Sequence, residues 1–312
     1  YSDDYDLIIS TEVFEDLGKS RNDRYEFILP NFDFNKEIKT KLSGNLIYST
    51  NGYGKFYNTN IKEKIFINNL SYNSLDKISE FGFINNYEIL FKNFNAETKN
   101  SKEFKNETQQ DIQGIIKLTS KLPFKKEGEK YNSFFTPIIS ARFNPDKNKN
   151  LKNKDRMIDF NNIYSINRIG SDETLEGGQS LTIGSEFKLD NLKKNNKTNE
   201  VLKLNLATSF RDEENEKLPT KSTLGKKMSN IIGKIGFKPN DIINFNYDFL
   251  LDNNLEQINY HKINTIFKVN KFFNKFEFLE ENNMIGKKSF ISNETSINFS
   301  DKNLLSFKTR QN

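Results

Sequence analysis

The feature that most constrains the fold is a two-residue alternation of apolar and polar side chains, in runs of about ten residues. Residues 201–210 read VLKLNLATSF, so leucines alternate with Lys203 and Asn205. Such alternation is typical of strands that have one apolar and one polar face. The pattern recurs along the chain, in residues 7–13, 38–48, 83–92, 115–119, 138–143, 163–169, 181–189, 241–250 and 261–269.

The spacing of turn signals predicts long strands. Clusters of Pro, Gly, Asn and Asp separate the runs about every 15 residues through the last quarter of the chain. Strands of about ten residues suit a tilted membrane-spanning strand, whereas soluble strands average about five or six. Counting the runs predicts roughly 14 to 16 strands. The turn clusters are residues 238–241, 252–254, 285–288 and 300–303, and long polar loops are expected at residues 99–110, 122–133, 144–159 and 211–229.

Composition excludes two other classes of chain. A transmembrane helix needs about 20 consecutive apolar residues, and the longest apolar stretches here, such as residues 136–141 and 231–237, are much shorter. Disordered chains are poor in aromatic residues, but this chain has 29 Phe and 12 Tyr among 312 residues. Aromatic and β-branched residues favour strands. The chain is therefore expected to fold, and to fold as β-structure.

Charge and residue inventory argue against nucleic-acid binding and against an enzyme. The net charge of +5 is spread along the chain, whereas nucleic-acid binding calls for a clustered basic face. The chain has no cysteine and one histidine, His261, so neither a Cys–His pair nor a His-rich zinc site can be built. His261 falls in register with the apolar side of its run, which favours a packing role. We expect no catalytic residue, no metal and no cofactor.

Long amphipathic strands joined by turns predict an all-β fold, a large antiparallel transmembrane β-barrel of the outer-membrane type. In lipid every backbone N–H and C=O must be paired within the protein, so the sheet must close on itself. Apolar side chains then face lipid, and polar side chains face a wet lumen. The candidate lumen-facing residues are Lys203, Asn205, Asn244, Asn246 and Asn264.

The most specific motif is residues 159–184, DFNNIYSINRIGSDETLEGGQSLTIG. It resembles the central barrel signature of the LptD family of lipopolysaccharide-assembly proteins, also called organic solvent tolerance proteins. In that family a strand ending in Asn-Arg is followed by a Gly-x-Asp turn and a Glu-Gly-Gly start to the next strand. We expect Arg168 and Asp172 to pair across this turn. The matching residues are Asn167, Arg168, Gly170, Asp172, Glu176, Gly177, Gly178 and Gly184.

Weaker matches extend the resemblance over nearly all of the chain. Residues 22–31 (NDRYEFILPN) resemble a barrel segment with a charged start, an apolar strand and a proline. Residues 218–252 resemble a later segment with a Leu-Pro loop and a Tyr-x-Phe-x-Leu-Asp strand. The chain departs from the family at Ser171, where an aromatic residue is common, and at Glu173, where an arginine is common.

The resemblance implies a protein of the Gram-negative outer membrane that transports and assembles lipopolysaccharide without covalent chemistry. Family members have a periplasmic jellyroll-like domain and a very large barrel, of a type that reaches about 26 strands. The resemblance also implies a periplasmic bridge of LptA that meets the N-terminal domain, the lipoprotein LptE as a plug inside the barrel, and a lateral gate between the first and last barrel strands. Residues 1–312 are then expected to be an interior portion of that barrel, without the jellyroll domain and the barrel ends.

Two alternatives remain open. Another outer-membrane channel or receptor would share the strand pattern but not the motif at residues 159–184. A secreted soluble β-protein used for adhesion would have shorter strands and would not depend on detergent. We also expect that the 312-residue piece refolds poorly in detergent by itself, because an incomplete barrel exposes two strand edges.

Overall fold

The computed structural model describes residues 5–19, 24–57, 60–192, 198–282, 288–300 and 303–312. Its single sheet has 17 strands, one above the expected range of 14 to 16. Two of these strands, β5 and β8, are only two and three residues long, and without them the number falls within that range. The described part of the chain contains no helix long and apolar enough to cross a membrane. The elements are β1 (Tyr5–Glu15), β2 (Tyr25–Ile38), β3 (Gly44–Tyr57), β4 (Ile61–Ser74), β5 (Lys77–Ile78), β6 (Ile84–Lys99), β7 (Thr108–Lys121), β8 (Phe124–Lys126), β9 (Tyr131–Asn144), β10 (Gly178–Leu192), β11 (Thr198–Arg211), η2 (Thr220–Ser222), β12 (Ile231–Phe237), β13 (Ile243–Leu251), β14 (Ile258–Val269), β15 (Phe272–Glu281), β16 (Ser289–Ser300) and β17 (Asn303–Gln311).

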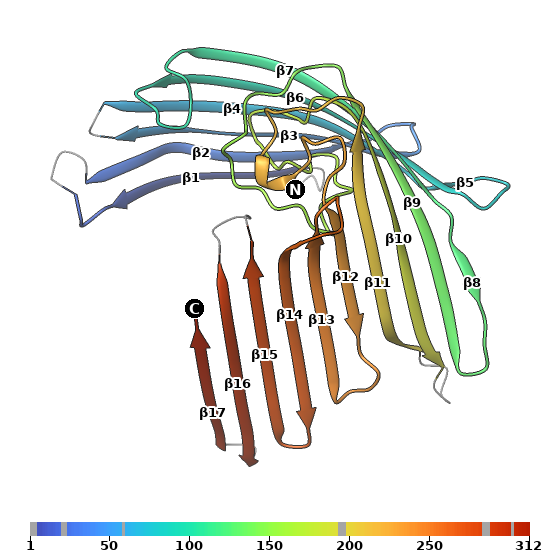
Figure 1. The fold of residues 1–312 in the computed structure, drawn as a ribbon. Helices are drawn as coiled ribbons and strands as arrows, with labels where there is room; N and C mark the ends of the chain where they lie inside the picture. Colours follow the sequence, from blue (N-terminus) through green and yellow to red (C-terminus); the bar gives the residue numbers. More distant parts are fainter. Residues whose placement is uncertain (1–4, 20–23, 58–59, 193–197, 283–287, 301–302) are drawn as a thin grey trace.

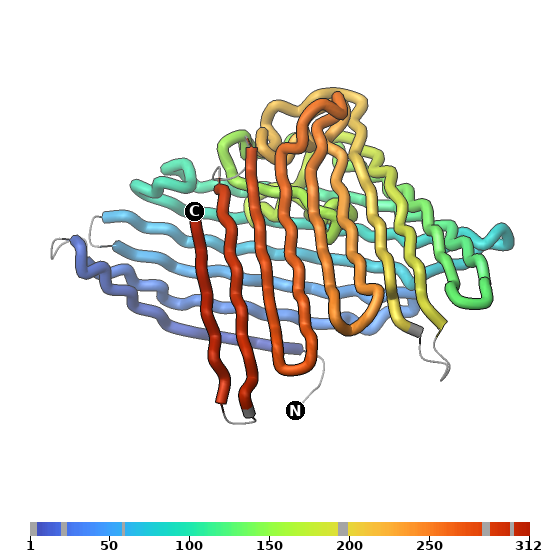
Figure 2. Tube along the Cα trace, turned by 60° about the horizontal axis from the view of Figure 1, so that its bottom comes forward, coloured from blue at the N-terminus to red at the C-terminus, as the bar shows by residue number. Residues whose placement is uncertain are grey.

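The sheet is an antiparallel meander in which each long strand pairs with the next one along the chain. It bends strongly, so that β1–β7 and β10–β17 form two blades that meet at β9 (Figures 1 and 2). No described residue of β1 pairs with β17, and the sheet stays open between them. The all-β antiparallel fold predicted from the alternation is confirmed.

Most of the predicted strands are present, and two are wrong. Residues 38–48 are not one strand, because β2 ends at Ile38 and β3 begins at Gly44. Residues 163–169 are not a strand either, since they form successive turns. The expected loop at residues 122–133 contains β8 and the start of β9. Three residues of the turn cluster 285–288 and two of the turn cluster 300–303 lie outside the described residues.

The two faces of the sheet have opposite polarity, and β9 shows this most clearly. Ile139 and Phe143 are about half exposed, at 50% and 48%, whereas Ser140 and Arg142 between them are buried. Neighbouring β10 repeats the arrangement, with exposed Ile183 next to buried polar residues. We call the face that carries Ser140 and Arg142 the inner face, because it lies on the concave side of the bend. On β9 and β10 the outer face is apolar and open.

The connections at the two rims of the sheet differ in length. Residues 145–177 link β9 to β10, and residues 212–230 link β11 to β12, at the same rim. At the opposite rim, residues 238–242 and 270–271 are enough to link β12 to β13 and β14 to β15. We call these the long-loop rim and the short-turn rim. The two longest connections turn back onto the inner face of the sheet (Figure 1).

Candidate functional site

Residues 145–177, which we call the inner segment, pack against the inner face of the sheet without forming a strand or a helix. Apolar side chains from the segment, such as Ile163, share one buried cluster with Ala207 of β11 and Leu250 of β13. The 212–230 connection adds Leu218 and Leu224 to this cluster. The segment therefore has a core of its own, formed with the wall of the sheet.

Arg168 is the polar centre of the inner segment. Its side chain is fully buried and makes a bidentate pair with the carboxylate of Glu176, with both N–O distances 2.6 Å. The remaining guanidinium hydrogens go to hydroxyl groups of the wall, at Thr182, Ser209 and Ser180, at 2.9–3.0 Å. A planar guanidinium fork is well suited to such a site, because it offers five donors in fixed directions.

Glu176 is also held by a second arginine, Arg211 at the end of β11. The other terminal nitrogen of Arg211 donates to the carbonyl oxygen of Gly177. Burial alone would raise the pKa of the Glu176 carboxyl, but the charge and hydrogen bonds of Arg168, with the charge of Arg211, lower that pKa to about 2. Glu176 therefore stays ionised, and it connects the segment to the wall.

Three cations of the wall bind main-chain oxygens of the inner segment. Lys92 donates to the carbonyl of Asp172 at 3.0 Å, and Lys117 donates to the carbonyl of Tyr164 at 2.6 Å. Arg142 donates to the carbonyls of Ile163 and Ser165 at 3.0 and 2.7 Å. These three side chains are buried. Carbonyl groups that a strand would pair with a neighbouring strand are thus satisfied by charged donors.

The glycines of the motif allow positive φ angles in the backbone and a close contact between the inner segment and β10. Gly170 and Gly178 have positive φ angles of 62° and 84°, which glycine adopts without steric cost. Gly184 lies on β10 beneath the inner segment, and a Cβ atom there would overlap the hydroxyl of Tyr164. Gly177 is equally crowded by the backbone of Asp146. The motif therefore builds the contact between the inner segment and β10.

The predicted pair between Arg168 and Asp172 is not formed, because the guanidinium reaches Glu176 instead. Asp172 contributes its main-chain carbonyl to Lys92. Asn167 donates from its side chain to the carbonyl of Ser171 at 3.2 Å and so stabilises the turn around Gly170. The structure brings together Arg168, Glu176 and the glycines of the motif, while Asn167 and Asp172 lie at the edge of this cluster.

The sequence did not single out Arg142, Arg211, Lys92 or Lys117. The available signal is position, since Arg142 occupies a polar place of an alternating run, two residues after Ser140. A charged residue at a polar place of a strand is equally typical of a solvated side chain in a barrel lumen. Only the fold shows that the inner segment covers it.

The five candidate lumen-facing residues lie on the inner face. Asn205 is buried two residues from Ala207, which packs on the inner segment. Asn246 and Asn264 are directly opposite each other in the pairing of β13 with β14. The other two, Lys203 and Asn244, follow from the same alternation, two residues from Asn205 and from Asn246.

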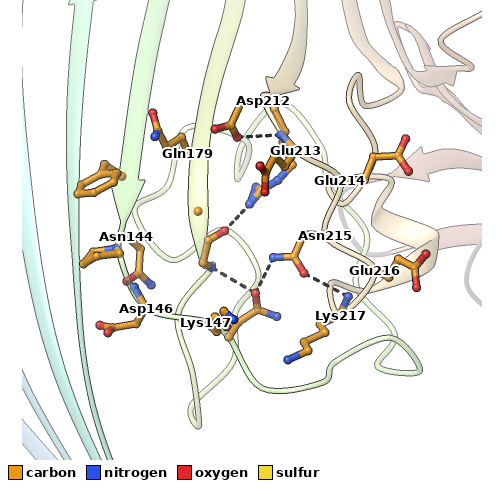
Figure 3. Close-up of a pocket in the computed structure, with 16 residues that line it drawn as sticks. Asn144, Asp146, Lys147, Gln179, Asp212, Glu213, Glu214, Asn215, Glu216 and Lys217 are labelled. Carbon is orange, nitrogen blue, oxygen red and sulfur yellow. Dashed lines mark hydrogen bonds between the residues drawn. The ribbon is translucent and has the colours of Figure 1, made fainter.

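A pocket of about 610 Å³ opens at the long-loop rim beside the inner segment (Figure 3). Asn148 lines it and accepts hydrogen bonds from the Asn215 side chain at 2.7 Å and from the Gly177 amide at 3.4 Å. This residue joins the two longest connections of the sheet. Acidic side chains, including Asp212, Glu213 and Glu216, surround the pocket.

Comparison with known proteins gives one family. A family model described as LptD, LPS transport system D, matches residues 85–289 of this chain. The matched region includes β7 to β15, the whole inner segment and all five candidate lumen-facing residues. A search of curated proteins finds no match.

Proposed function

This chain belongs to the LptD family, and from that premise we propose that its curved sheet is part of the wall of an outer-membrane barrel that carries lipopolysaccharide to the outer leaflet. Membership of the family connects the chain with lipopolysaccharide transport and assembly in the outer membrane of Gram-negative bacteria. The finer proposal concerns which face of the sheet does this and how.

One observation carries the proposal, namely the inverted polarity of the sheet. In β9 the apolar Ile139 and Phe143 are exposed while the polar Ser140 and Arg142 are buried. A soluble protein buries its apolar face, because removing about 25 cal/mol per Å² of apolar surface from water drives folding. Exposed apolar side chains on long neighbouring strands fit contact with lipid. The outer face is therefore the proposed lipid face.

The inner face is the proposed path of the polar part of lipopolysaccharide. Lys203, Asn205, Asn244, Asn246 and Asn264 supply donors and acceptors along β11, β13 and β14. Apolar side chains of this face, such as Ala207 and Leu250, are covered by the inner segment, so acyl chains would stay toward the lipid. Hydrogen-bonding side chains at this face suit a sugar chain that exchanges water for protein contacts.

Loop length supports an orientation for the sheet. Outer-membrane barrels have short periplasmic turns and long extracellular loops. The long-loop rim, with residues 145–177 and 212–230, then faces the cell exterior, and the short-turn rim faces the periplasm. In this orientation the inner segment lies across the inner face on the exterior side of the path.

Three finer parts of the proposal rest on the family. Lipopolysaccharide would arrive over a bridge of LptA, LptE would occupy the lumen as a plug, and release would occur through a lateral gate between the first and last strands of the complete barrel. The open edges of β1 and β17 are compatible with further strands in that barrel. Residues 1–312 are accordingly proposed to be an interior portion of the barrel.

The experiment is depletion of the protein in its host, with surface lipopolysaccharide measured by a probe that does not cross the outer membrane. We expect surface lipopolysaccharide to fall while unrelated barrel proteins still assemble. Unchanged surface lipopolysaccharide would contradict the proposal and would favour the alternative, a general channel or receptor barrel with the same inverted polarity.

A further inference from the structure

A second pocket, of about 250 Å³, lies on the inner face beneath the inner segment. Glu88 of β6, Lys117 and Lys121 of β7 and Glu186 of β10 line it, and Tyr164 of the inner segment covers it. Lys121 is the last residue of β7, so the pocket opens toward the short-turn rim. At about 30 Å³ per water molecule, it holds about eight waters or one sugar ring.

The hydroxyl group of Tyr164 is buried, and it has no hydrogen-bond partner among the described residues. This hydroxyl fits there only because Gly184 has no side chain. Buried polar groups are nearly always paired with protein or with a bound molecule. An unpaired hydroxyl in the lining of a pocket therefore points to a hydrogen-bonding occupant.

Three further side chains of the lining are free to bind. Asp76, Lys121 and Glu186 form no hydrogen bond or ion pair within the described part of the chain. Lys117, by contrast, is engaged by the carboxylate of Glu88 and by the carbonyl of Tyr164. The pocket thus offers two free donors, an ammonium and a hydroxyl, beside two free carboxylate acceptors.

The charge of the lining decides against an anion. Three carboxylates, those of Asp76, Glu88 and Glu186, face two ammonium groups, Lys117 and Lys121. A phosphate group would meet net repulsion and, among the described residues of the lining, would find one free cation, Lys121. A ring that carries several hydroxyl groups can donate to the carboxylates and accept from Lys121 and Tyr164 together.

We propose that this pocket binds a neutral sugar ring of the lipopolysaccharide carbohydrate, on the periplasm-facing side of the inner segment; this rests on the function proposed above. The ring would satisfy the Tyr164 hydroxyl and lie between Lys121 and Glu186. The inner segment then does more than cover the wall, because it supplies one side of a carbohydrate site.

The test is calorimetric binding of fully deacylated lipopolysaccharide from the host to the full-length protein with its natural partners. The detergent must lack a sugar head group, because a maltoside would compete. We expect saturable binding that weakens about three- to tenfold in Tyr164→Phe, since that change removes one hydrogen bond of typical net strength. Glu186→Gln and Lys121→Gln should weaken binding by similar or larger factors.

The matched control is Tyr247→Phe, which removes the tyrosine hydroxyl that contacts His261 on the outer face. Lys121 is exposed, so Lys121→Gln tests the site without risk to folding. Equal binding by wild type, Tyr164→Phe and Lys121→Gln would overturn the inference. Binding of inorganic phosphate in place of the carbohydrate would also overturn it. So would a cross-link between residue 164 and LptE. The function stands separately, because it falls only if depletion leaves surface lipopolysaccharide unchanged.

Discussion

Arg168 holds the carboxylate of Glu176 by two parallel hydrogen bonds, from Nε to Oε2 and from Nη2 to Oε1, each 2.6 Å long. Both side chains are almost completely excluded from solvent. The seven residues between them include the turn around Gly170, so the pair closes the end of the inner segment on itself. The same carboxylate contacts Arg211 of β11, which fixes this closed end to the sheet.

The first prediction concerns Arg168→Met. Removing one partner of a buried ion pair costs about 3–5 kcal/mol when the other charge is left unpaired. Here Arg211 still contacts Glu176, so the cost is smaller than that. We expect the inner segment to become sensitive to protease while the sheet stays intact. Lys221→Met is the matched control, since Lys221 forms a solvent-exposed pair with Asp155 and such pairs contribute about 0–1 kcal/mol. Equal protease sensitivity of the two variants would show that Arg168 does not hold the segment.

The second prediction concerns acid. The pKa of Glu176 is lowered from 4.5 to about 2 in the folded protein. A lowered folded-state pKa means that the carboxylate stabilises the fold at pH above its ordinary pKa, and that this contribution is lost as the pH falls toward 2. Pepsin digestion should therefore leave the inner segment intact near pH 4 and release it near pH 2. In Glu176→Gln the segment should be cleaved to the same extent at both values.

The third prediction concerns Gly184→Ala. The added methyl group would displace the Tyr164 hydroxyl and crowd the carbonyl of Leu206, and overpacking of this kind costs about 1–3 kcal/mol. We expect faster hydrogen exchange in residues 160–166, partly restored by adding Tyr164→Phe. Gly236→Ala is the control, because the nearest atom to its new methyl group is 3.6 Å away. Identical exchange in the two single variants would refute the role of Gly184.

The fourth prediction compares the two faces of the sheet. An arginine facing lipid near the membrane midplane costs about 2–4 kcal/mol, and less near the interfaces. Leu206→Arg on the outer face should reduce the amount of folded protein in outer membranes, whereas Asn244→Arg on the inner face should have little effect. Folded protein is measured by its heat-dependent shift in gel mobility. A larger loss from Asn244→Arg would reverse the assignment of faces.

Much of the wall could be predicted from sequence, because the two-residue period is a direct result of strand geometry. Residues 201–210 and 261–269 alternate as strands do, and they lie in β11 and β14. The alternation also predicts Asn246 and Asn264 on the polar faces of their strands, and the two residues are directly opposite each other in the pairing of β13 with β14. Here local pattern and tertiary structure agree.

The inner segment could not be predicted in this way. Residues 163–169 carry apolar side chains at strand-like spacing, but they form turns, because Ile163 and Ile169 are buried against the wall. The partner of Arg168 is Glu176, eight residues away. The sequence instead favours the nearer Asp172 as the partner. The wall residues Lys92 and Arg142 bind main-chain carbonyls. Every residue type has such a carbonyl, so the sequence does not reveal this contact.

The central claim is that the polar inner face carries the sugar part of lipopolysaccharide while the outer face meets lipid. The most direct measurement is cross-linking in living cells from a photoreactive residue placed at 246 or at 247, neighbours on opposite faces of β13. The account predicts an adduct with the carbohydrate part of lipopolysaccharide from position 246 and none with it from position 247. Carbohydrate adducts from position 247 alone, or from both positions equally, would contradict it.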